Sequence, residues 1–310
     1  MGQYSELPAR YVIPPATSMP AAPRTRPETG PAAGASTVSS SPGTAATLRS
    51  ASTYTVGTRL STPLVLLHGF TQTSESWGPV IAALSRRRPL VLPDAPGHGA
   101  ASRVKADLWQ AAALLVRTVA NRAFWAGYSM GGRMALHVAL AYPDQVERLV
   151  LISTTAGIED PVQRAARRAN DHATAERIER YGLEPFLEEW LAQPLFATLS
   201  PTAARREDRL ANTPEGLASS LRLAGVGAQQ PLWSRLGELS RRRLPVLLVA
   251  GELDERYCHY AQRMADEIGA SATVALIPRA GHACHLERPQ EVATAIDAFC
   301  SPAPAAQGSP

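Results

Sequence analysis

A serine between two glycines, placed directly after an apolar run, constrains this chain more than any other feature. Residues 123–133 read A-F-W-A-G-Y-S-M-G-G-R, in which Gly127, Ser129 and Gly131 fill the pattern G-x-S-x-G. A serine on a sharp turn between a strand and a helix has a strained backbone, and its close neighbours have no room for a Cβ atom. The turn also aims backbone N–H groups at the space above the serine oxygen. The pattern therefore predicts a short strand, a reactive serine and then a helix.

Apolar runs and helical patterns alternate on both sides of this turn. Strands are predicted over 63–67, 89–94, 147–153, 244–250 and 272–277, and helices over 75–85, 104–120, 257–268 and 289–299. Helices that alternate with strands supply the crossover connections that parallel strands need. We therefore expect an α/β fold, built on a doubly wound, mostly parallel sheet.

The alternation is interrupted between residues 157 and 239, a stretch that is helical in character, rich in arginine and without a strand pattern. We expect 157–239 to form a helical cap inserted between two core segments, 47–156 and 240–300. Residues 1–46 are dense in Pro, Ala, Ser, Thr and Gly, so we expect a disordered extension, and 301–310 should form a flexible tail. An organellar transit peptide, or a start codon assigned too far upstream, are alternatives for the extension.

Composition restricts the partners of this chain. It has 310 residues with a net charge of +4, and no apolar run approaches the ~18 residues that span a bilayer. We therefore expect no membrane insertion. The arginines occur in short groups without interleaved aromatic residues, which argues against nucleic acid and favours an anionic small molecule. A solvated face or loop is the alternative for these groups.

The three cysteines, Cys258, Cys284 and Cys300, show no spacing typical of a metal site. We expect them to be free thiols in a reducing compartment, the cytoplasm. The chain is expected to be a monomer or a small homo-oligomer, with no bound metal.

Two downstream residues are placed to activate Ser129. A serine hydroxyl needs a histidine to take its proton and a carboxylate to fix the histidine tautomer. In a doubly wound sheet these groups lie just beyond the carboxyl ends of strands. Asp254 follows the strand at 244–250 in G-E-L-D-E, and His282 follows the strand at 272–277 in R-A-G-H-A-C-H. The order Ser129, Asp254, His282 is that of the α/β-hydrolase fold.

Neighbouring residues are alternatives at two of these positions. Glu252 and Glu255 flank Asp254, which lies deepest in the turn after its strand. His285 competes with His282 but belongs to the approach to the last helix. The remaining histidines are expected to be structural, gating or surface residues: His68, His98, His137, His172 and His259.

The turn His68-Gly69-Phe70 follows a strand that neighbours the serine turn. It is placed to present the Phe70 N–H beside the Met130 N–H, and the pair would form a two-donor oxyanion hole. A plain turn between a strand and a helix is the alternative.

Several motifs together carry a family resemblance. They are L-H-G-F at 67–70, P-D-A-P-G-H-G at 93–99, G-Y-S-M-G-G-R at 127–133, Q-P-L-F at 193–196, G-E-L-D-E at 251–255 and I-P-R-A-G-H-A-C-H-L-E at 277–287. Over about residues 60–299 the chain resembles the 2-succinyl-6-hydroxy-2,4-cyclohexadiene-1-carboxylate synthases of menaquinone biosynthesis. Many α/β-hydrolases share the triad and P-G-H-G motifs. Three features narrow the resemblance from α/β-hydrolases in general to these synthases. They are Arg133 after S-M-G-G, the W-x-x-Q-P-L-F run from Trp190, and I-P-R-A-G-H-x-x-H.

The resemblance implies a lyase that eliminates pyruvate from 2-succinyl-5-enolpyruvyl-6-hydroxy-3-cyclohexene-1-carboxylate, without a metal or an organic cofactor. It also implies that Ser129, activated by His282 and Asp254, acts as a base on a ring C–H. The oxyanion hole would then hold the enolate oxygen of the succinyl ketone.

A substrate with three carboxylates needs cations in a partly dry pocket. Arg133, one helical turn after the serine, is placed to face the cleft. The resemblance matches Arg167 to a cap arginine that contacts substrate, and Tyr128 and Trp190 to pocket residues. Arg209, in R-L-A-N, is our choice for a further cap arginine. Surface solvation is the alternative for each of these arginines.

One motif departs from the family, because P-D-A-P-G-H-G replaces the commoner D-L-P-G-H-G and displaces Asp94 by one position. We interpret Asp94 as structural. A serine hydrolase of the same fold, an esterase, thioesterase or C–C hydrolase, is the second functional hypothesis. A third is a non-catalytic receptor or scaffold, against which an intact triad with a pocket arginine argues.

Overall fold

The computed structural model describes residues 50–54, 62–85 and 88–301 of the chain. The extension expected at 1–46 lies outside the described residues, as does the tail after residue 301.

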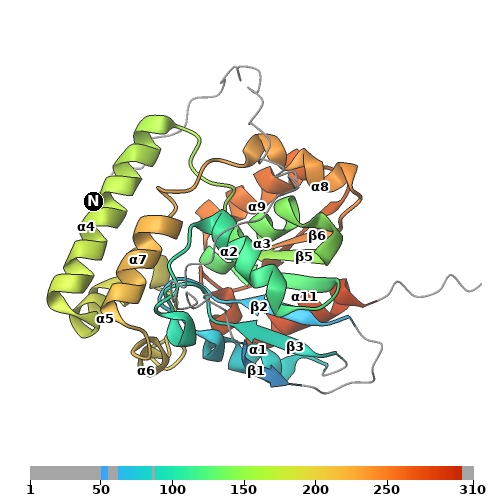
Figure 1. Cartoon of the computed structure of the whole chain (residues 1–310). Coiled ribbons are helices and arrows are strands. Elements are labelled where there is room, and N and C mark those ends of the chain that lie inside the picture. The colour runs from blue at the N-terminus through green and yellow to red at the C-terminus, as the bar shows by residue number, and fades with distance from the viewer. Residues whose placement is uncertain (1–49, 55–61, 86–87, 302–310) are drawn as a thin grey trace, which may run out of the picture. The chain divides into compact units, whose positions relative to one another are not determined.

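A seven-stranded sheet lies at the centre of the described residues (Figure 1). Its strands are β1 (Ser50–Tyr54), β2 (Leu64–Leu67), β3 (Leu90–Pro93), β4 (Ala123–Tyr128), β5 (Val146–Ile152), β6 (Val246–Gly251) and β7 (Ala272–Ile277). The spatial order is β1-β3-β2-β4-β5-β6-β7. All neighbours run parallel except β1, which pairs antiparallel with β3. The doubly wound, mostly parallel sheet is confirmed.

Helices cover both faces of the sheet. Those packed against it are α1 (Gly78–Ala83), α2 (Leu108–Leu115), α3 (Met130–Ala141), α8 (Gly237–Arg241), α9 (Glu255–Ile268), α10 (Cys284–Glu287) and α11 (Pro289–Cys300). Val65 and Leu67 of β2 enter a core with α2, α3 and α9, whereas Leu64 and Leu66 enter a second core with α1 and α11. Because both faces are covered, the strands are near-continuous apolar runs.

Two helices are shorter than the sequence suggested. The helix expected over 104–120 begins after Asp107, whose carboxylate accepts from the Gln110 N–H at 2.8 Å, while the Gln110 side chain accepts from the Asp107 N–H at 3.0 Å. This capping box stops the helix from extending backwards. The helix expected over 75–85 is divided into a 3₁₀ turn at Ser74–Trp77 and α1.

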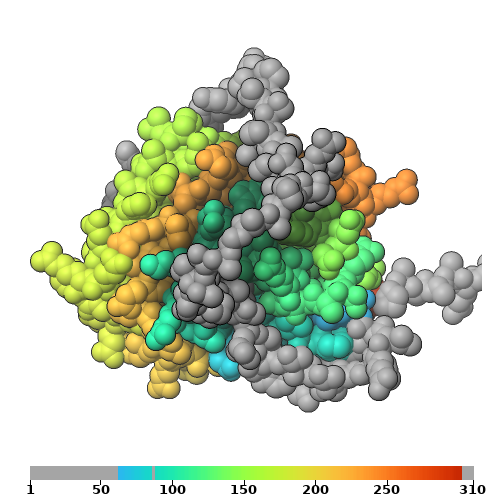
Figure 2. All heavy atoms as spheres, in the orientation of Figure 1, coloured from blue at the N-terminus to red at the C-terminus, as the bar shows by residue number. Residues whose placement is uncertain are grey.

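The stretch 157–239 contains helices and no strand among its described residues. Its helices include α4 (Pro161–Tyr181), α5 (Leu183–Leu191), α6 (Arg206–Arg209) and α7 (Pro214–Ala224), which gather on one side of the sheet (Figure 1). Ile178, Leu187 and Leu217 form their shared apolar core. In Figure 2 the cap atoms, yellow-green to orange, lie at the left against the green and teal atoms of the core. α8 also begins inside 157–239, but it packs against α9 and α3.

Candidate active site

Ser129 occupies the turn between β4 and α3. Its φ of 51° and ψ of −108° are a strained combination for a residue with a side chain. The Ser129 N–H donates to the Ile152 carbonyl and the Thr154 hydroxyl donates to the Ser129 carbonyl, each at 2.8 Å, so β5 and its loop hold the turn. A Cβ atom on Gly127 would lie 2.2 Å from the Gly131 carbonyl oxygen. No residue larger than glycine fits there.

Asp254 and His282 lie beside this serine. Asp254 follows β6 and His282 follows β7. The carboxyl ends of β4, β6 and β7 lie at the same edge of the sheet. The His282 Nδ1–H donates to Asp254 Oδ2 at 2.8 Å, and His282 Nε2 lies 3.3 Å from Ser129 Oγ. Asp254 Oδ1 accepts from the Tyr257 N–H at 3.2 Å. In this geometry His282 can take the serine proton while Asp254 holds the ring in the required tautomer.

The alternative residues lie elsewhere. Glu252 and Glu255 are exposed, and Glu252 accepts from the Arg279 N–H at 3.2 Å. His285 is fully buried, its Nε2 accepts from Gln72 Nε2 at 3.3 Å, and burial lowers its pKa well below the usual value. Within the described residues none of the three takes part in the hydrogen-bond chain to the serine.

The backbone N–H groups of Phe70 and Met130 were expected to form an oxyanion hole. Among the described residues, neither N–H donates to a protein acceptor. Met130 begins α3, where a helix leaves its N–H groups unpaired. The loop before Phe70 is held by the Gly69 N–H, which donates to Gln72 Oε1 at 3.0 Å. Both N–H groups are therefore available to an oxygen of a ligand.

Two of the expected arginines are buried cations. Arg133 is 7% exposed, and its Nη1 donates to the carbonyl at the end of α7 at 2.7 Å and to Gln229 Oε1 at 3.3 Å. Arg209 is 2% exposed, its Nε donates to the Ala204 carbonyl at 2.8 Å, and its Nη1 donates to Thr71 Oγ1. Burial lowers the pKa of each to about 10, so both stay charged at neutral pH.

Neither of these guanidinium groups has a carboxylate within 4.0 Å in the described part of the chain. A buried charge without a counter-charge is costly. Arg167 differs, because it is 39% exposed and its Nε pairs with Asp171 Oδ1 at 2.8 Å. Arg133 and Arg209 therefore have no directly bonded counter-charge in the described residues, although the more distant charges of Asp171 and Asp208 favour them.

Aromatic rings surround the triad. Trp190 of α5 packs on Phe70 with ring centroids 5.2 Å apart, and its buried Nε1–H has no acceptor among the described residues. The Tyr128 ring packs against the His285 ring at a tilt of 38°, with the ring centroids 4.0 Å apart. Burial raises the pKa of the Tyr128 hydroxyl, and the charge of Arg209 opposes this.

Sequence reasoning missed Tyr257 and Gln229. The Tyr257 ring lies 4.4 Å from the His282 ring, and only its position just after Asp254 hinted at this contact. Gln229 is 2% exposed and holds Arg133 through one amide atom. Its other amide atom, Nε2, has no partner within the described ranges. No spacing in the sequence pointed to Gln229.

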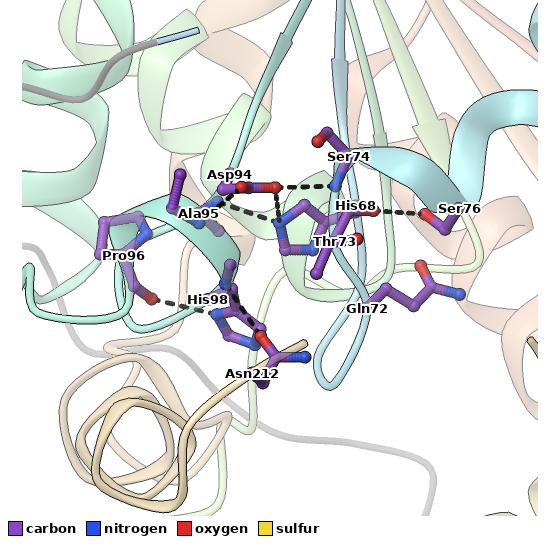
Figure 3. A network of polar contacts seen from close by, with 12 residues as sticks. His68, Gln72, Thr73, Ser74, Ser76, Asp94, Ala95, Pro96, His98 and Asn212 are labelled. Atoms are coloured by element: carbon purple, nitrogen blue, oxygen red, sulfur yellow. Dashed lines mark hydrogen bonds and ion pairs between the residues drawn. The ribbon is translucent and has the colours of Figure 1, made fainter. Parts of the chain in front are cut away.

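Buried histidines support the loops around the site (Figure 3). His68 and His98 each donate through Nδ1 to a backbone carbonyl and accept through Nε2 from a backbone N–H. Burial lowers the pKa of His68, and it lowers the pKa of His98 to about 3, so both rings are neutral. Asp94 accepts from two backbone N–H groups, each at 2.8 Å. These bonds give the three residues a structural role.

Other expectations concern metals, membranes and thiols. In the residues that the structure describes, no group of three His, Cys, Asp or Glu side chains could hold a metal ion. No described helix is long and apolar enough to cross a membrane. The three cysteines are free, and burial raises the pKa of Cys284 to about 12.

Comparisons with known proteins agree with this geometry. A family model described as the alpha/beta hydrolase family matches residues 64–295. A protein of Bacillus subtilis (strain 168), which carries the provisional name 2-succinyl-6-hydroxy-2,4-cyclohexadiene-1-carboxylate synthase, is 35% identical over 259 residues, or 78% of this chain and 92% of the relative. The synthase of that name from Klebsiella pneumoniae is 33% identical over 74% of this chain and 90% of its own length. The solved structure of MenH from S. aureus is 31% identical, with a TM-score of 0.74 over 80% of this chain and 96% of that chain.

Proposed function

Because this chain belongs to the alpha/beta hydrolase family, and within it to the 2-succinyl-6-hydroxy-2,4-cyclohexadiene-1-carboxylate synthases, which are carbon–oxygen lyases, we propose its reaction from theirs. The chain eliminates pyruvate from 2-succinyl-5-enolpyruvyl-6-hydroxy-3-cyclohexene-1-carboxylate in menaquinone biosynthesis. The product is the cyclohexadiene carboxylate of the family name. No metal or organic cofactor takes part.

In the proposed mechanism, Ser129 acts as a base. Its hydroxyl passes a proton to His282 as it removes a proton from the ring carbon beside the succinyl ketone, and Asp254 stabilises the imidazolium that forms. The C–H electron pair moves into the ketone oxygen, which accepts hydrogen bonds from Phe70 and Met130. The enolate then returns its electrons to the ring and breaks the C–O bond to the enolpyruvyl group. The departing enolate of pyruvate takes the proton held by His282.

The observation that carries this proposal is the pair of buried arginines without carboxylate partners, Arg133 and Arg209. A neutral ester would leave both buried charges without an anionic partner. A substrate with three carboxylates offers them charge-assisted hydrogen bonds. The pair therefore favours the lyase over a serine hydrolase, which the triad alone would equally support.

Arg167 and the aromatic residues Tyr128 and Trp190 complete the proposed binding site. Arg167 lies close enough for its charge to lower the pKa of Arg133 further, although burial is the larger cause. The unpaired Trp190 Nε1–H can donate to a substrate oxygen. We place the reaction in the cytoplasm because the cysteines are free thiols. The expectation of a monomer or small homo-oligomer stays a prediction.

The test compares two reactions on the same purified proteins. Pyruvate release from the enolpyruvyl substrate is followed with lactate dehydrogenase and NADH, and ester cleavage with p-nitrophenyl acetate. Arg133→Ala should lower kcat/KM for pyruvate release by about 10- to 100-fold, the value of one charge-assisted contact, and leave ester cleavage within about twofold. Arg168→Ala, at an exposed position of α4, is the matched control and should change neither reaction.

A wild-type protein that releases no pyruvate but cleaves neutral esters efficiently would contradict the proposal. The serine hydrolase would then be the better assignment, with Ser129 as a nucleophile.

A further inference from the structure

Thr71, which directly follows Phe70, has a backbone conformation that is unusual for its side chain. Its φ is 68°, in the left-handed region that favours glycine. A β-branched residue in this region is strained, and the strain persists only where the surroundings determine the conformation. The described residues around Thr71 do so.

Every polar group of Thr71 is held by a residue from a distant segment. Its N–H donates to His98 Nε2 at 3.3 Å, and His98 lies in the loop after β3. Its carbonyl accepts from Asn212 Nδ2 at 2.8 Å, and its hydroxyl accepts from Arg209 Nη1. Asn212 and Arg209 both belong to the cap. The cap thus holds the residue next to the proposed oxyanion-hole donor.

Asn212 uses both ends of its buried amide. It is 6% exposed, its Oδ1 accepts from the Gly99 N–H at 3.0 Å, and its Nδ2 also donates to the Arg209 carbonyl at 2.9 Å. These partners fix which amide atom is oxygen, because an N–H needs an acceptor and a carbonyl needs a donor. Figure 3 shows Asn212 reaching the polar network of His68, Asp94 and His98. One side chain therefore connects the cap to two loops of the core.

The loop that carries the Phe70 N–H is held on both sides of that residue. Before it, Gly69 donates to the Gln72 side chain at 3.0 Å and accepts from the Gln72 N–H at 3.2 Å. After it, Thr71 is held by the contacts from His98 and the cap. If the Thr71 carbonyl is released, the strained residue can relax and rotate the Phe70 peptide. A displacement of about 1 Å at a catalytic donor is enough to slow a reaction by about 100-fold.

We propose that Asn212 is a positioning residue which, through Thr71, sets the direction of the Phe70 N–H, so that the cap completes the oxyanion hole of the core. The inference rests on the proposed function, which assigns the Phe70 N–H to the oxyanion hole. Asn212 itself touches no reacting atom. Its loss should lower turnover rather than substrate affinity.

The principal test is Asn212→Ala. We expect kcat for pyruvate release to fall by about 10- to 100-fold, within the range for a lost or misplaced oxyanion donor, with KM changed by less than about threefold. Hydrogen exchange of the peptide 68–74, measured by mass spectrometry, should become faster in the same variant. That measurement does not depend on the reaction.

Thr213→Ala is the matched control. Thr213 is the next residue in the chain, and its hydroxyl caps α7 by accepting from the Gly216 N–H at 3.1 Å. Loss of this cap should lower Tm by an amount comparable to that of Asn212→Ala. It should leave exchange of 68–74 unchanged and kcat within about twofold, because its contact is internal to the cap.

Asn212→Asp separates the acceptor contact of the amide from its two donor contacts. The carboxylate can still accept from the Gly99 N–H, but it cannot donate to the carbonyls of Thr71 and Arg209. We expect Asn212→Asp to lose kcat as Asn212→Ala does. A wild-type kcat in Asn212→Asp would show that Gly99 is the important partner, and would overturn the proposal.

Two other outcomes would also overturn it. If Asn212→Ala raises KM alone, the residue acts on substrate binding through Arg209 rather than on the oxyanion hole. If exchange of 68–74 is unchanged, Asn212 does not hold the loop. If the wild-type protein released no pyruvate, only the proposed function would be refuted. Hydrogen exchange of the peptide 68–74 and the kcat for p-nitrophenyl acetate would still test the role of Asn212 in the same variants.

Discussion

His282 Nε2 lies 3.3 Å from Ser129 Oγ, although 153 positions of the chain separate the two residues. The contact exists because β4 and β7 end at the same edge of the sheet. The other ring nitrogen is bonded to Asp254 at 2.8 Å. In the proposed mechanism, proton transfer along this hydrogen-bond chain needs all three side chains at once.

Removal of any member of the triad should therefore remove the function of the whole unit. Ser129→Ala, Asp254→Asn and His282→Ala should each lower kcat by orders of magnitude, and the double and triple variants should be little worse than the worst single variant. Steady-state pyruvate release by purified variants gives the measurement. Losses that multiply in the combined variants would show that the residues act independently.

Arg209 should give the site its affinity for small carboxylates. A ligand that binds only the folded state raises stability, by about 2.7 kcal/mol at a concentration 100 times its Kd. Succinate should thus raise Tm of the wild type in thermal scans, and most of that shift should be lost in Arg209→Ala. Arg206, at the exposed start of the same helix, provides the control, and Arg206→Ala should keep the full shift. If succinate raised Tm equally in Arg209→Ala and Arg206→Ala, succinate would bind at a site that does not include Arg209.

Gly127 and Gly78 should respond to alanine in opposite directions. At Gly127 the added Cβ would lie 2.2 Å from a backbone carbonyl of α3, so Gly127→Ala should cost more than about 4 kcal/mol or prevent folding. At Gly78, in α1, an added Cβ would meet no other described part of the chain within 4 Å beyond its sequence neighbours and the helix backbone, and Gly78→Ala should raise stability by about 0.4–1 kcal/mol. Urea unfolding of both variants measures the difference. A well-folded Gly127→Ala protein would mean that the turn can open.

Buried neutral histidines should make the protein sensitive to acid. Burial lowers the pKa of His137 to about 4, from an ordinary value of 6.5. Above pH 6.5 this ring is neutral in both the folded and the unfolded chain, and its contribution to the free energy of unfolding is fully present. As the pH falls from 6.5 towards 4, only the unfolded chain takes up the proton. Stability is lost at up to about 1.4 kcal/mol per pH unit, about 3 kcal/mol in total.

The measurement is the free energy of unfolding in urea at pH 7 and pH 5. His137→Gln, which can still donate to the Arg133 carbonyl, should reduce the pH dependence by about one proton. His259→Asn, at an exposed position, should leave it unchanged. An unchanged slope in His137→Gln would show that another group controls acid unfolding.

The sequence alone determined the features that depend on local chemistry. The glycines around Ser129 predicted the strained turn because sterics at that spacing admit nothing larger. Apolar runs predicted the strands, and the bounds of β7 agree with the predicted range 272–277. Strands that alternate with helices then predicted that Asp254 and His282 follow strands of one parallel sheet, and the structure brings them to the serine. Helix ends were less accurate, since a capping side chain such as Asp107 outweighs the apolar pattern.

Only the tertiary structure decided how the cap engages the core. Arg133 could be predicted to lie one turn after Ser129, but not to donate to a carbonyl of α7, which is 91 positions away. Thr71 and Asn212 are 141 positions apart. Thr71 stands in none of the motifs, and Asn212 ends R-L-A-N, from which only Arg209 was chosen. Local propensity and periodicity decide which face of an element is buried. The pairing of one polar group with another across the cap depends on how whole elements pack, which no short stretch of sequence encodes.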